Sequence, residues 1–518
     1  MTYLRTNVYA NGGDFSNSTI LWYARGVAAM KERALADPTS WRFYGAIHGF
    51  DTDLWRKDGY ISDLDAMPAQ EQIGLYWNQC QHGSWYFLPW HRGYVLAIEA
   101  ILREAIVRLG GPTDWALPYW NYFAPNENGL PPAFATRDWP DGKGDNPLFV
   151  EQRWGPDKDG KTVYVPLDQV NLEALTDPDF TGVSNGGDPG FGGVDTGYQH
   201  GGRPHGRLEG QPHDLVHVFV GGSNPADPLL PGLMTTPRTA GLDPIFWLHH
   251  ANIDRLWEVW IRGPVSLGNP TEPKWLDGPE SIGDHPFVLP SPDGTAWTYT
   301  PGEMANLATL DYEYDDVSAG AVTSAMKRRM ERLREFAAPR SMKGITAMTS
   351  RRQNVEMVGA SHRPLRVAGR EEVRTSVQLN DGARRRVTKS FTAAEADAGQ
   401  AAAPDRMFLN LENVRGLSDA VVFQVYVNLP EDANPADHPE RLAGSVGLFG
   451  VTEATSADDE HGGAGLTFVL EITHIIDALH LENALETDAL DVRILPVMHV
   501  PEEAQVSIGR VSLFRQGR

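Results

Sequence analysis

Apolar side chains recur at intervals of three and four residues through much of the first half of the chain, the spacing typical of one face of an α-helix. We predict helices at 14–36, 40–50, 70–110, 213–219 and 245–262. Ser16 or Ser18 is expected to cap the first helix. Pro89 is expected to divide the third, with a new helix starting just after it. The N-terminal part of the chain is therefore predicted to be mainly α-helical.

Helical periodicity weakens in two stretches between these helices. Residues 124–212 are rich in Pro, Gly and Asp, residue types that favour turns, and residues 264–303 are also loop-like. We interpret 124–212 as long surface loops over a helical core. The Gly-rich part of this stretch, Ser184–Gly206, is expected to be mobile.

After Arg406 the pattern changes to two-residue alternation, which indicates β-strands. The expected strands are Met407–Val414, Val421–Asn428, Gly447–Val451, Leu466–Ile472, Leu490–Leu495 and Val506–Leu513. Short strands at this spacing favour a β-sandwich. The predicted organisation is a mainly α-helical domain over 1–318, a basic linker over 319–354 and a C-terminal all-β sandwich domain over 355–518.

Charge and composition narrow the partners that the chain can have. A formal net charge of -23 disfavours nucleic acid and anionic membranes. There is no apolar run of about 18 residues to span a membrane. The polar N-terminus shows no signal peptide, so a cytoplasmic location is expected; a homo-oligomer is compatible with all of this. Residues 326–390 hold 17 Lys or Arg against 6 Asp or Glu. We interpret this basic segment as neutralising part of the negative charge of the rest of the chain. The alternative is a docking patch for an anionic partner.

Six of the 16 histidines fall into two triplets. The first is His48, His82 and His91, and the second is His213, His217 and His250. His213 and His217 are four residues apart, so they lie on one face of a helix and can converge on one ion. Imidazole ligands without thiolate or carboxylate suit copper or zinc. Two ions with three imidazoles each and an open position suit dioxygen, which indicates a redox metal.

The residues around these histidines resemble the two copper signatures of the tyrosinase, catechol oxidase and molluscan haemocyanin family. Cys80-x-His82 with Trp90-His91-Arg92 is similar to the first. His213-x-x-x-His217 followed by Asp243-Pro-x-Phe-x-x-His249-His250-x-x-x-Asp254-Arg-Leu-Trp257 is similar to the second. The resemblance covers about residues 40–262. It implies a four-helix bundle around a type-3 dicopper site that binds dioxygen or peroxide.

The resemblance also implies a role for each residue of the motifs. Copper A would take His48, His82 and His91, and copper B would take His213, His217 and His250. His249 would be a neighbour that is not a ligand. Asp254 would accept a hydrogen bond that orients a ligand imidazole. Cys80, the only cysteine, would form a thioether with the imidazole of His82, although an inert buried thiol is the alternative.

Three further positions bear on activity. Glu209 stands where plant polyphenol oxidases carry a glutamate that holds a water, which is proposed to deprotonate an incoming phenol; a solvated loop carboxylate is the alternative. Asp214 stands where many tyrosinases carry Asn. Its carboxylate either raises the pKa of a neighbour or bonds a nearby backbone group. Phe246 either stacks on a phenol or is a packed core residue.

The C-terminal half carries a looser resemblance. Tyr312-Glu-Tyr314 resembles the Tyr-x-Tyr motif that closes the core domain of the family, and Arg5 resembles its N-terminal partner. Residues 355–518 look similar to the C-terminal β-sandwich of plant polyphenol oxidases and haemocyanins, which can cover the active site and hold the enzyme latent. Proteolysis in the linkers at 320–350 and 399–404 is expected to test this.

The expected function is a copper-dependent tyrosinase that converts phenols to o-diphenols and o-diphenols to o-quinones with dioxygen. Its expected partners are phenolic small molecules and O2. One alternative is a catechol oxidase or o-aminophenol oxidase without activity on monophenols. Another, from a different class, is an oxygen carrier like haemocyanin. The single copper domain argues against a carrier, because molluscan haemocyanins are large arrays of such units.

Overall fold

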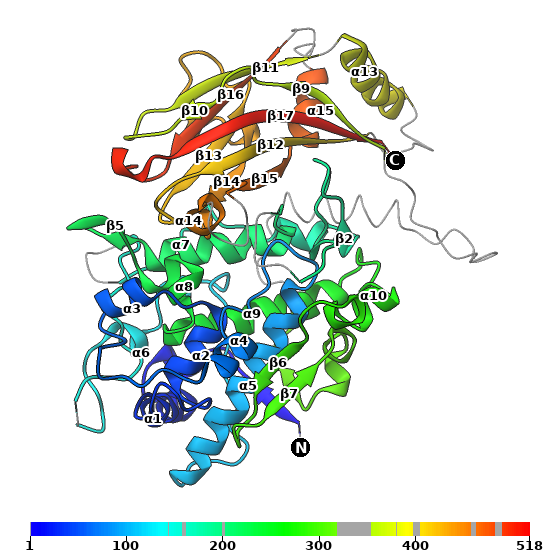
Figure 1. The fold of residues 1–518 in the computed structure, drawn as a ribbon. Coiled ribbons are helices and arrows are strands. Elements are labelled where there is room, and N and C mark those ends of the chain that lie inside the picture. Colours follow the sequence, from blue (N-terminus) through cyan, green and yellow to red (C-terminus); the bar gives the residue numbers. More distant parts are fainter. Residues whose placement is uncertain are drawn as a thin grey trace, which may run out of the picture.

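The computed structural model describes residues 2–142, 144–157, 162–198, 203–318, 354–379, 381–396, 405–456, 463–481 and 489–517. A helical body forms the lower part of Figure 1 and a curved β-sheet lies above it. Each has its own buried apolar cluster. Most of the predicted basic linker lies outside the described residues, so the predicted domain division stays a prediction. None of the helices within these ranges is long and apolar enough to cross a membrane.

The helical body is organised around four helices that carry the motif histidines. These are α2 (Trp41–His48), α5 (Phe87–Arg108), α7 (Leu215–Gly221) and α9 (Pro244–Ile261). Around them lie α1 (Ser18–Lys31), α3 (Thr52–Lys57), α4 (Gln70–Tyr76), α6 (Pro132–Ala135), α8 (Pro237–Ala240), α10 (Pro273–Leu276) and α11 (Pro301–Met304). Helix α5 packs against both α1 and α9. Every residue of α9 before Ile261 is buried, including polar residues such as His250, Asn252 and Asp254.

Two details of the predicted helices are wrong. Asn17, and neither Ser16 nor Ser18, caps α1, since its side chain accepts from the N–H of Thr19. Pro89 does not divide the third predicted helix. Helix α5 begins at Phe87, so Pro89 lies in its first turn, where the backbone N–H has no helical partner to lose. The interruption falls earlier, between the end of α4 and the start of α5.

The Gly-rich segment predicted to be mobile is packed over most of its described length. It contributes the short strand β3 (Gly193–Val194), which pairs with β2 (Thr181–Gly182). Residues 186–194 are buried. At Gly186, a Cβ atom would lie 2.5 Å from the Phe514 ring, and φ is +100°. Glycine therefore serves here to let the loop pass close to the β-sheet, and the composition alone did not distinguish this use from mobility.

The C-terminal part is one antiparallel sheet in the strand order β14-β13-β16-β11-β9-β17-β12-β15, with β10 paired to β17. Its strands are β9 (Asn354–Ala360), β10 (Leu365–Arg366), β11 (Val373–Leu379), β12 (Arg406–Arg415), β13 (Val422–Val427), β14 (Leu442–Gly447), β15 (Leu466–Glu471), β16 (Ala489–Pro496) and β17 (Ser507–Gly517). The two edge strands, β14 and β15, come into contact. The sheet thus curls into a nearly closed, barrel-like sandwich around its own core. Helices α13 (Asp381–Ala396), α14 (Val451–Thr455) and α15 (Thr473–Leu481) accompany it.

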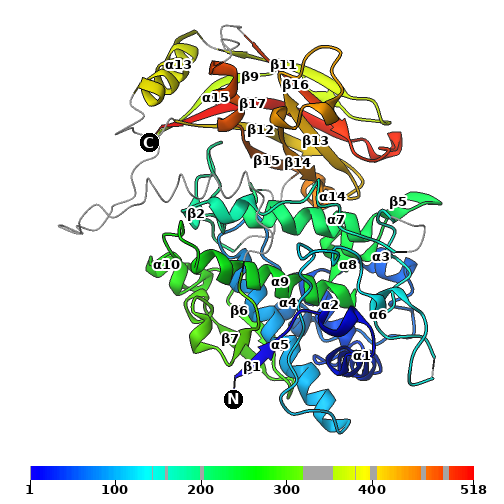
Figure 2. The ribbon, with the colours of Figure 1, turned by 180° about the vertical axis from the view of Figure 1, so that it is seen from behind.

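The predicted strand Gly447–Val451 is wrong, and the correct structure matters for the site. Strand β14 ends at Gly447, and α14 starts at Val451. The residues between them form a turn that points at the helical body. A Cβ atom on Gly447 would lie 3.0 Å from Leu215 of α7, so the sheet and that helix pack closely at this point. Both views show α14 directly beside α7 (Figures 1 and 2).

Candidate metal centre

The six histidines predicted as ligands meet in one buried cluster inside the helical body. His48 ends α2, His82 lies in the loop before α5, and His91 lies in α5. His213 precedes α7 by two residues, His217 lies within it, and His250 lies in α9. All six are at most 3% exposed. Helices that are distant in sequence therefore converge on a single place in the fold.

Ring positions bring the members of each predicted triplet together, but they do not divide the six histidines into those triplets, since donor atoms of His48, His91 and His250 also lie within 4.8 Å of one another. In the first triplet the ring centroids are 5.3, 5.5 and 5.7 Å apart. In the second they are 4.5, 5.0 and 5.5 Å apart. The triplets also touch each other, since the His91 and His250 rings stack with centroids 4.5 Å apart. Three imidazoles at such spacing can each turn one nitrogen toward a common ion.

Hydrogen bonds fix which ring nitrogen is available. Nδ1 of four of these histidines bonds an oxygen at 2.7–2.9 Å. The partners are the carbonyl of Pro237 for His48, that of Phe87 for His91, a carboxylate oxygen of Asp214 for His213, and the carbonyl of Met234 for His217. Because Nδ1 carries the proton toward these acceptors, Nε2 carries the lone pair that a metal binds.

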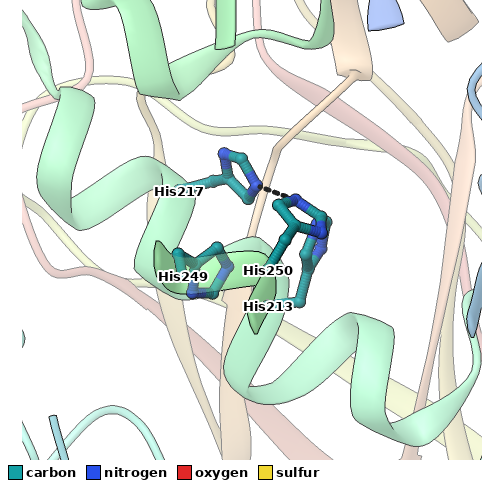
Figure 3. A group of neighbouring side chains, drawn as sticks. All are labelled: His213, His217, His249 and His250. Carbon is teal, nitrogen blue, oxygen red and sulfur yellow. Dashed lines mark hydrogen bonds between the residues drawn. The ribbon is translucent and has the colours of Figure 1, made fainter. Parts of the chain in front are cut away.

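Nε2 of His48, His82, His91 and His213 finds no hydrogen-bond partner among the described residues. A buried polar atom without a partner is costly. Nε2 of His217 faces Nε2 of His250 at 3.4 Å (Figure 3). Burial lowers the pKa of His48 to about 4 and lowers the pKa of the other five well below the usual histidine value. The imidazoles are thus neutral, converging donors, and these properties fit a pair of copper ions.

His249 lies beside this group and differs from its members. It is fully buried, and its ring centroid is 5.4 Å from that of His213 and 5.0 Å from that of His217 (Figure 3). Neither ring nitrogen has a hydrogen-bond partner within the described chain. One group whose donor atoms lie within 4.8 Å of one another comprises His213, His217, His249 and His250. Distance alone therefore does not separate His249 from the ligands.

Cys80 lies against the imidazole of His82. Its Sγ is 3.4 Å from Nδ1 of that ring, and the side chain is buried. Burial raises the pKa of the thiol well above its usual value. The contact places sulfur and imidazole next to each other as a thioether requires, and the bond itself stays a prediction.

Asp254 has partners other than the predicted imidazole. Its carboxylate accepts hydrogen bonds from Arg92 and, at 2.6 Å each, from the hydroxyls of Tyr312 and Tyr314. Arg5 donates to it at 3.2 Å. Burial acts to raise the pKa of Asp254, but the two arginines and the two tyrosine hydroxyls together outweigh it, so the pKa is lowered. Asp254 therefore holds α5, α9 and the β1–β8 strand pair (Tyr3–Arg5 and Tyr312–Tyr314) together beneath the histidines.

The same network confirms the predicted pairing of Arg5 with the Tyr-x-Tyr motif. Arg5 donates to the Tyr314 hydroxyl at 2.9 Å, and its guanidinium lies 3.8 Å from the centre of the Tyr312 ring. Arg5 is completely buried. The two ends of the helical body are thus closed by a charged and aromatic contact rather than by a disulfide.

Glu209 is buried, and this excludes a solvated loop carboxylate. Its two oxygens accept from the backbone N–H of Gly83 at 2.9 and 3.1 Å. Burial, with a smaller contribution from Asp214, raises the pKa of Glu209 to about 8, although His205 acts in the opposite direction. A buried carboxylate with a pKa near neutrality, next to the loop of His82, has the properties of a general base.

Asp214 bonds two imidazoles and not the backbone group expected as one alternative. One oxygen accepts from His213 and the other accepts from Nδ1 of His205 at 2.7 Å. Burial raises the pKa of Asp214, and His205 opposes this. Sequence reasoning overlooked His205. Its spacing of four residues before Glu209 was the available signal, but a lone histidine in a Gly-rich segment has many possible roles.

Phe246 is fully buried among the imidazoles. Its ring centroid lies 4.9 Å from that of His48, 5.8 Å from that of His217 and 4.1 Å from that of His250. It also packs edge-on against Trp247. These contacts fit the packed-core alternative, and a contact with substrate stays a prediction.

A residue of the C-terminal part completes the site, and the sequence did not reveal it. Phe449, in the turn after β14, stacks on His217 with ring centroids 4.3 Å apart. Its ring also meets His213 and His82 edge-on, at 5.6 and 5.7 Å. It is 1% exposed. The turn that was predicted as a strand thus inserts an aromatic ring over both histidine triplets.

Comparison with known proteins agrees with this site. The profile of the common central domain of tyrosinase matches residues 38–188 and 158–263. The tyrosinase HcTyr1 of Hahella sp. (strain CCB-MM4) is 30% identical over 528 residues, covering 99% of both chains. The chain belongs to the tyrosinase family. It is an oxidoreductase of the tyrosinase and polyphenol oxidase type, a family whose members use a type-3 copper centre.

Two further matches cover the plant branch of the tyrosinase family. Catechol oxidase B of Solanum tuberosum is 36% identical over 197 residues, which is 35% of this chain and 30% of the plant protein. The solved structure of latent apple tyrosinase has the same fold, with a TM-score of 0.60 and 20% identity over 99% of this chain and 97% of the apple protein. Residues 354–516 match a domain of unknown function. The similarity to HcTyr1 and to the apple structure therefore extends over the C-terminal sheet as well as the helical body.

Proposed function

We propose that this tyrosinase hydroxylates monophenols to o-diphenols and oxidises o-diphenols to o-quinones, using dioxygen. His48, His82 and His91 would hold one copper ion, and His213, His217 and His250 the other. The observation that carries the proposal is the set of converging, neutral imidazoles. Among the described residues, Nε2 of four of them has no hydrogen-bond partner, and Nε2 of His217 and of His250 face each other. When bound, the copper pair supplies dioxygen binding and the electron transfer that the protein's own side chains cannot perform.

The protein side chains supply orientation and proton transfer. The phenol hydroxyl has a pKa near ~10, so at neutral pH it needs a base before it can bind a metal as phenolate. Glu209 would take this proton, directly or through a water. It is buried and held by the N–H of Gly83, which places it beside the loop of His82. Asp214 would keep the His213 ring oriented with Nε2 toward the metal.

A substrate ring would occupy the place that Phe449 fills. The Phe449 ring stacks on the His217 imidazole in an apolar, water-excluded setting, and aromatic stacking of this kind suits a phenol. Phe449 would therefore act as an internal stand-in for substrate and make the full-length enzyme latent. Activity would require the C-terminal part to move away or this side chain to be removed.

The first test is oxygen uptake by copper-loaded, full-length protein and by the Phe449→Ala variant, with L-tyrosine and with L-DOPA. We expect the variant to consume oxygen with both substrates and at least about tenfold faster than the original chain, because the stacking site is vacated. Leu417→Ala, at an exposed position of the same domain, is the matched control and should leave uptake unchanged.

The pattern of uptake separates the alternatives. Uptake with L-DOPA alone would establish a catechol oxidase, and the Asp214→Asn variant would then show whether that carboxylate suppresses monophenol hydroxylation. No uptake with either substrate, in the variant and after removal of the C-terminal part by proteolysis, would contradict the proposed function.

A further inference from the structure

His205 lies between two buried carboxylates next to the histidine cluster. Its Nδ1 is 2.7 Å from Oδ2 of Asp214 and 3.7 Å from Oε1 of Glu209. The His205 side chain is 9% exposed, and the two acidic side chains are at most 1% exposed. Its ring also lies nearly parallel to that of His82, with centroids 6.4 Å apart. His205 thus belongs to the wall of the site, although it is not in either triplet.

The two carboxylates that His205 touches reach opposite halves of the centre. Asp214 uses its other oxygen to accept from Nδ1 of His213, a ligand of the second triplet, at 2.9 Å. Glu209 accepts from the backbone N–H of Gly83, the residue after His82 of the first triplet. A continuous path of polar contacts therefore runs from His213 through Asp214, His205 and Glu209 to the His82 loop.

The buried polar atoms of this group depend on one another for hydrogen bonds. Nδ1 of His205 donates to Oδ2 of Asp214 at 2.7 Å, and both acidic side chains are at most 1% exposed. A buried acceptor that loses its donor is not compensated by water, which is costly. Alanine at this position would leave Oδ2 of Asp214 without that donor and would remove the side chain that lies between the two acids.

We propose that His205 is a positioning residue that clamps the two halves of the dicopper centre to each other. Through Asp214 it fixes the ring of His213, and through Glu209 it fixes the loop that carries His82. The proposal rests on the proposed function only in requiring that the six histidines bind copper; it does not depend on which phenol is oxidised or on whether the enzyme is latent.

The test measures copper release from copper-loaded, full-length protein to a chelator, without any substrate. We expect His205→Ala to release copper about 10–100-fold faster than the original chain, the size typical of losing a residue that supports a metal ligand. His205→Asn should stay within a few-fold of the original chain, because its side-chain amide can donate near the position of Nδ1. His438→Ala, at a partly exposed histidine of the C-terminal part, is the matched control.

A mutant cycle separates the clamp from a general loss of stability. Asp214→Ala should release copper about as fast as His205→Ala, and the double variant should be no faster than Asp214→Ala alone, because both changes break one path. Three outcomes would each overturn the proposal. They are additive effects on copper release in the double variant, an unchanged release rate in His205→Ala, and a release rate in His205→Asn as high as that in His205→Ala. Normal copper retention without phenol oxidation in the Phe449→Ala variant and after proteolysis would contradict the proposed function and leave the clamp intact, whereas a wild-type chain that binds no copper would overturn both.

Discussion

At the scale of single residues, the site is built by holding four of the six imidazoles through a hydrogen bond at Nδ1. Nδ1 of His48, His91 and His217 donates to a backbone carbonyl, which fixes the ring and leaves Nε2 as the lone-pair nitrogen. Backbone carbonyls cannot change protonation state, so this part of the orientation is independent of pH. His213 is different, because its acceptor is the Asp214 carboxylate, and this makes its orientation sensitive to neighbouring charges.

The first prediction concerns Glu209 as a base. Its pKa is raised to about 8, mainly by burial, and bound copper would lower it through its positive charge. A carboxyl group accepts a proton only when ionised, so kcat/KM for a monophenol should fall as the pH drops through a value at or below about 8. Glu209→Gln should lose this dependence and about 10²–10⁴-fold in kcat/KM. The measurement is the pH profile of oxygen uptake in the Phe449→Ala background, and an unchanged profile in Glu209→Gln would rule this role out.

The second prediction concerns Cys80, whose Sγ lies 3.4 Å from the His82 ring. A thioether forms with loss of one hydrogen from the thiol and one from the ring. Intact mass spectrometry of copper-matured protein should therefore give a mass two hydrogens lower than that of protein made without copper. Cys80→Ser should show no such difference between the two preparations. Equal masses for the original chain in both preparations would mean that Cys80 remains a buried thiol.

The residues that sequence reasoning found are those with a fixed place in a local motif. His213 and His217 follow from helix geometry, and His82, His91 and His250 follow from their flanking residues. His205 and Phe449 were missed because each acts through a contact that chain spacing does not encode. The partners of Asp254 were also missed, since Arg92 and the two tyrosines reach it from three separate segments.

At the scale of elements, α5 and α9 carry both the ligands and their support. One turn after His250, α9 presents Asp254, and directly after His91, α5 presents Arg92. Their ion pair joins the two helices, and Arg92 also lies 3.9 Å above the Trp257 ring. The residues of the two copper signatures thus serve two purposes, metal binding at some positions and helix pairing at neighbouring positions of the same helices.

The third prediction is a stability effect at this helix pair. Removing one partner of a buried ion network costs about 3–5 kcal/mol, so Asp254→Ala should lower the free energy of unfolding by that amount. Arg108→Ala, which breaks the exposed pair with Glu104, should cost less than about 1 kcal/mol. Denaturant unfolding measures both. Equal effects would mean that the network contributes no more than a surface pair.

This third effect also has a defined pH dependence. Because the folded-state pKa of Asp254 is lowered, its contribution is present above the ordinary aspartate pKa and is lost as the pH falls through the folded value. The difference between the original chain and Asp254→Ala should therefore shrink in acid.

Element types were easier to predict than their ends or their packing. The pattern of apolar residues identified α1, α2, α5, α7 and α9 and most strands of the C-terminal sheet, because each of these elements buries many of them. It misplaced Gly447–Val451, where alternating apolar residues serve two different bodies: Leu448 packs in the core of the sheet and Phe449 in the core of the helical part. A pattern read along one chain cannot show which body a side chain enters.

At the scale of the whole molecule, the contact between the two bodies is partly ionic and largely buried. Arg406 and Glu471 of the sheet meet Asp177, Asp188 and Arg207 of the helical body. Arg406 lies 2.8 Å from Glu471, and Arg207 lies 2.9 Å from Asp188. On another part of the interface, Arg238 of α8 pairs with Glu453 of α14 at 3.0 Å. The interface therefore holds Phe449 over the histidines with charges as well as apolar contacts.

The fourth prediction follows from this interface. Arg406→Ala leaves buried carboxylates short of one cation, which costs about 3–5 kcal/mol. The population with the sheet displaced should rise, and oxygen uptake by the full-length enzyme should increase at least about tenfold. Arg366→Ala, an exposed arginine of the same sheet, should have no effect. Phe449→Ala combined with Arg406→Ala should be little faster than Phe449→Ala alone, since both remove the same block.

Two separate features keep Phe449 over the histidines: the covalent connection between the two bodies and the noncovalent contacts across their interface. A cut in the connecting segment removes the link but leaves every buried contact in place. What changes is the effective concentration of Phe449 at the site. In the intact chain this concentration is high and fixed by the covalent connection, whereas after the cut it equals the concentration of the detached body in solution. The cleaved protein should therefore show almost no oxygen uptake in a concentrated stock and should gain activity over time after dilution.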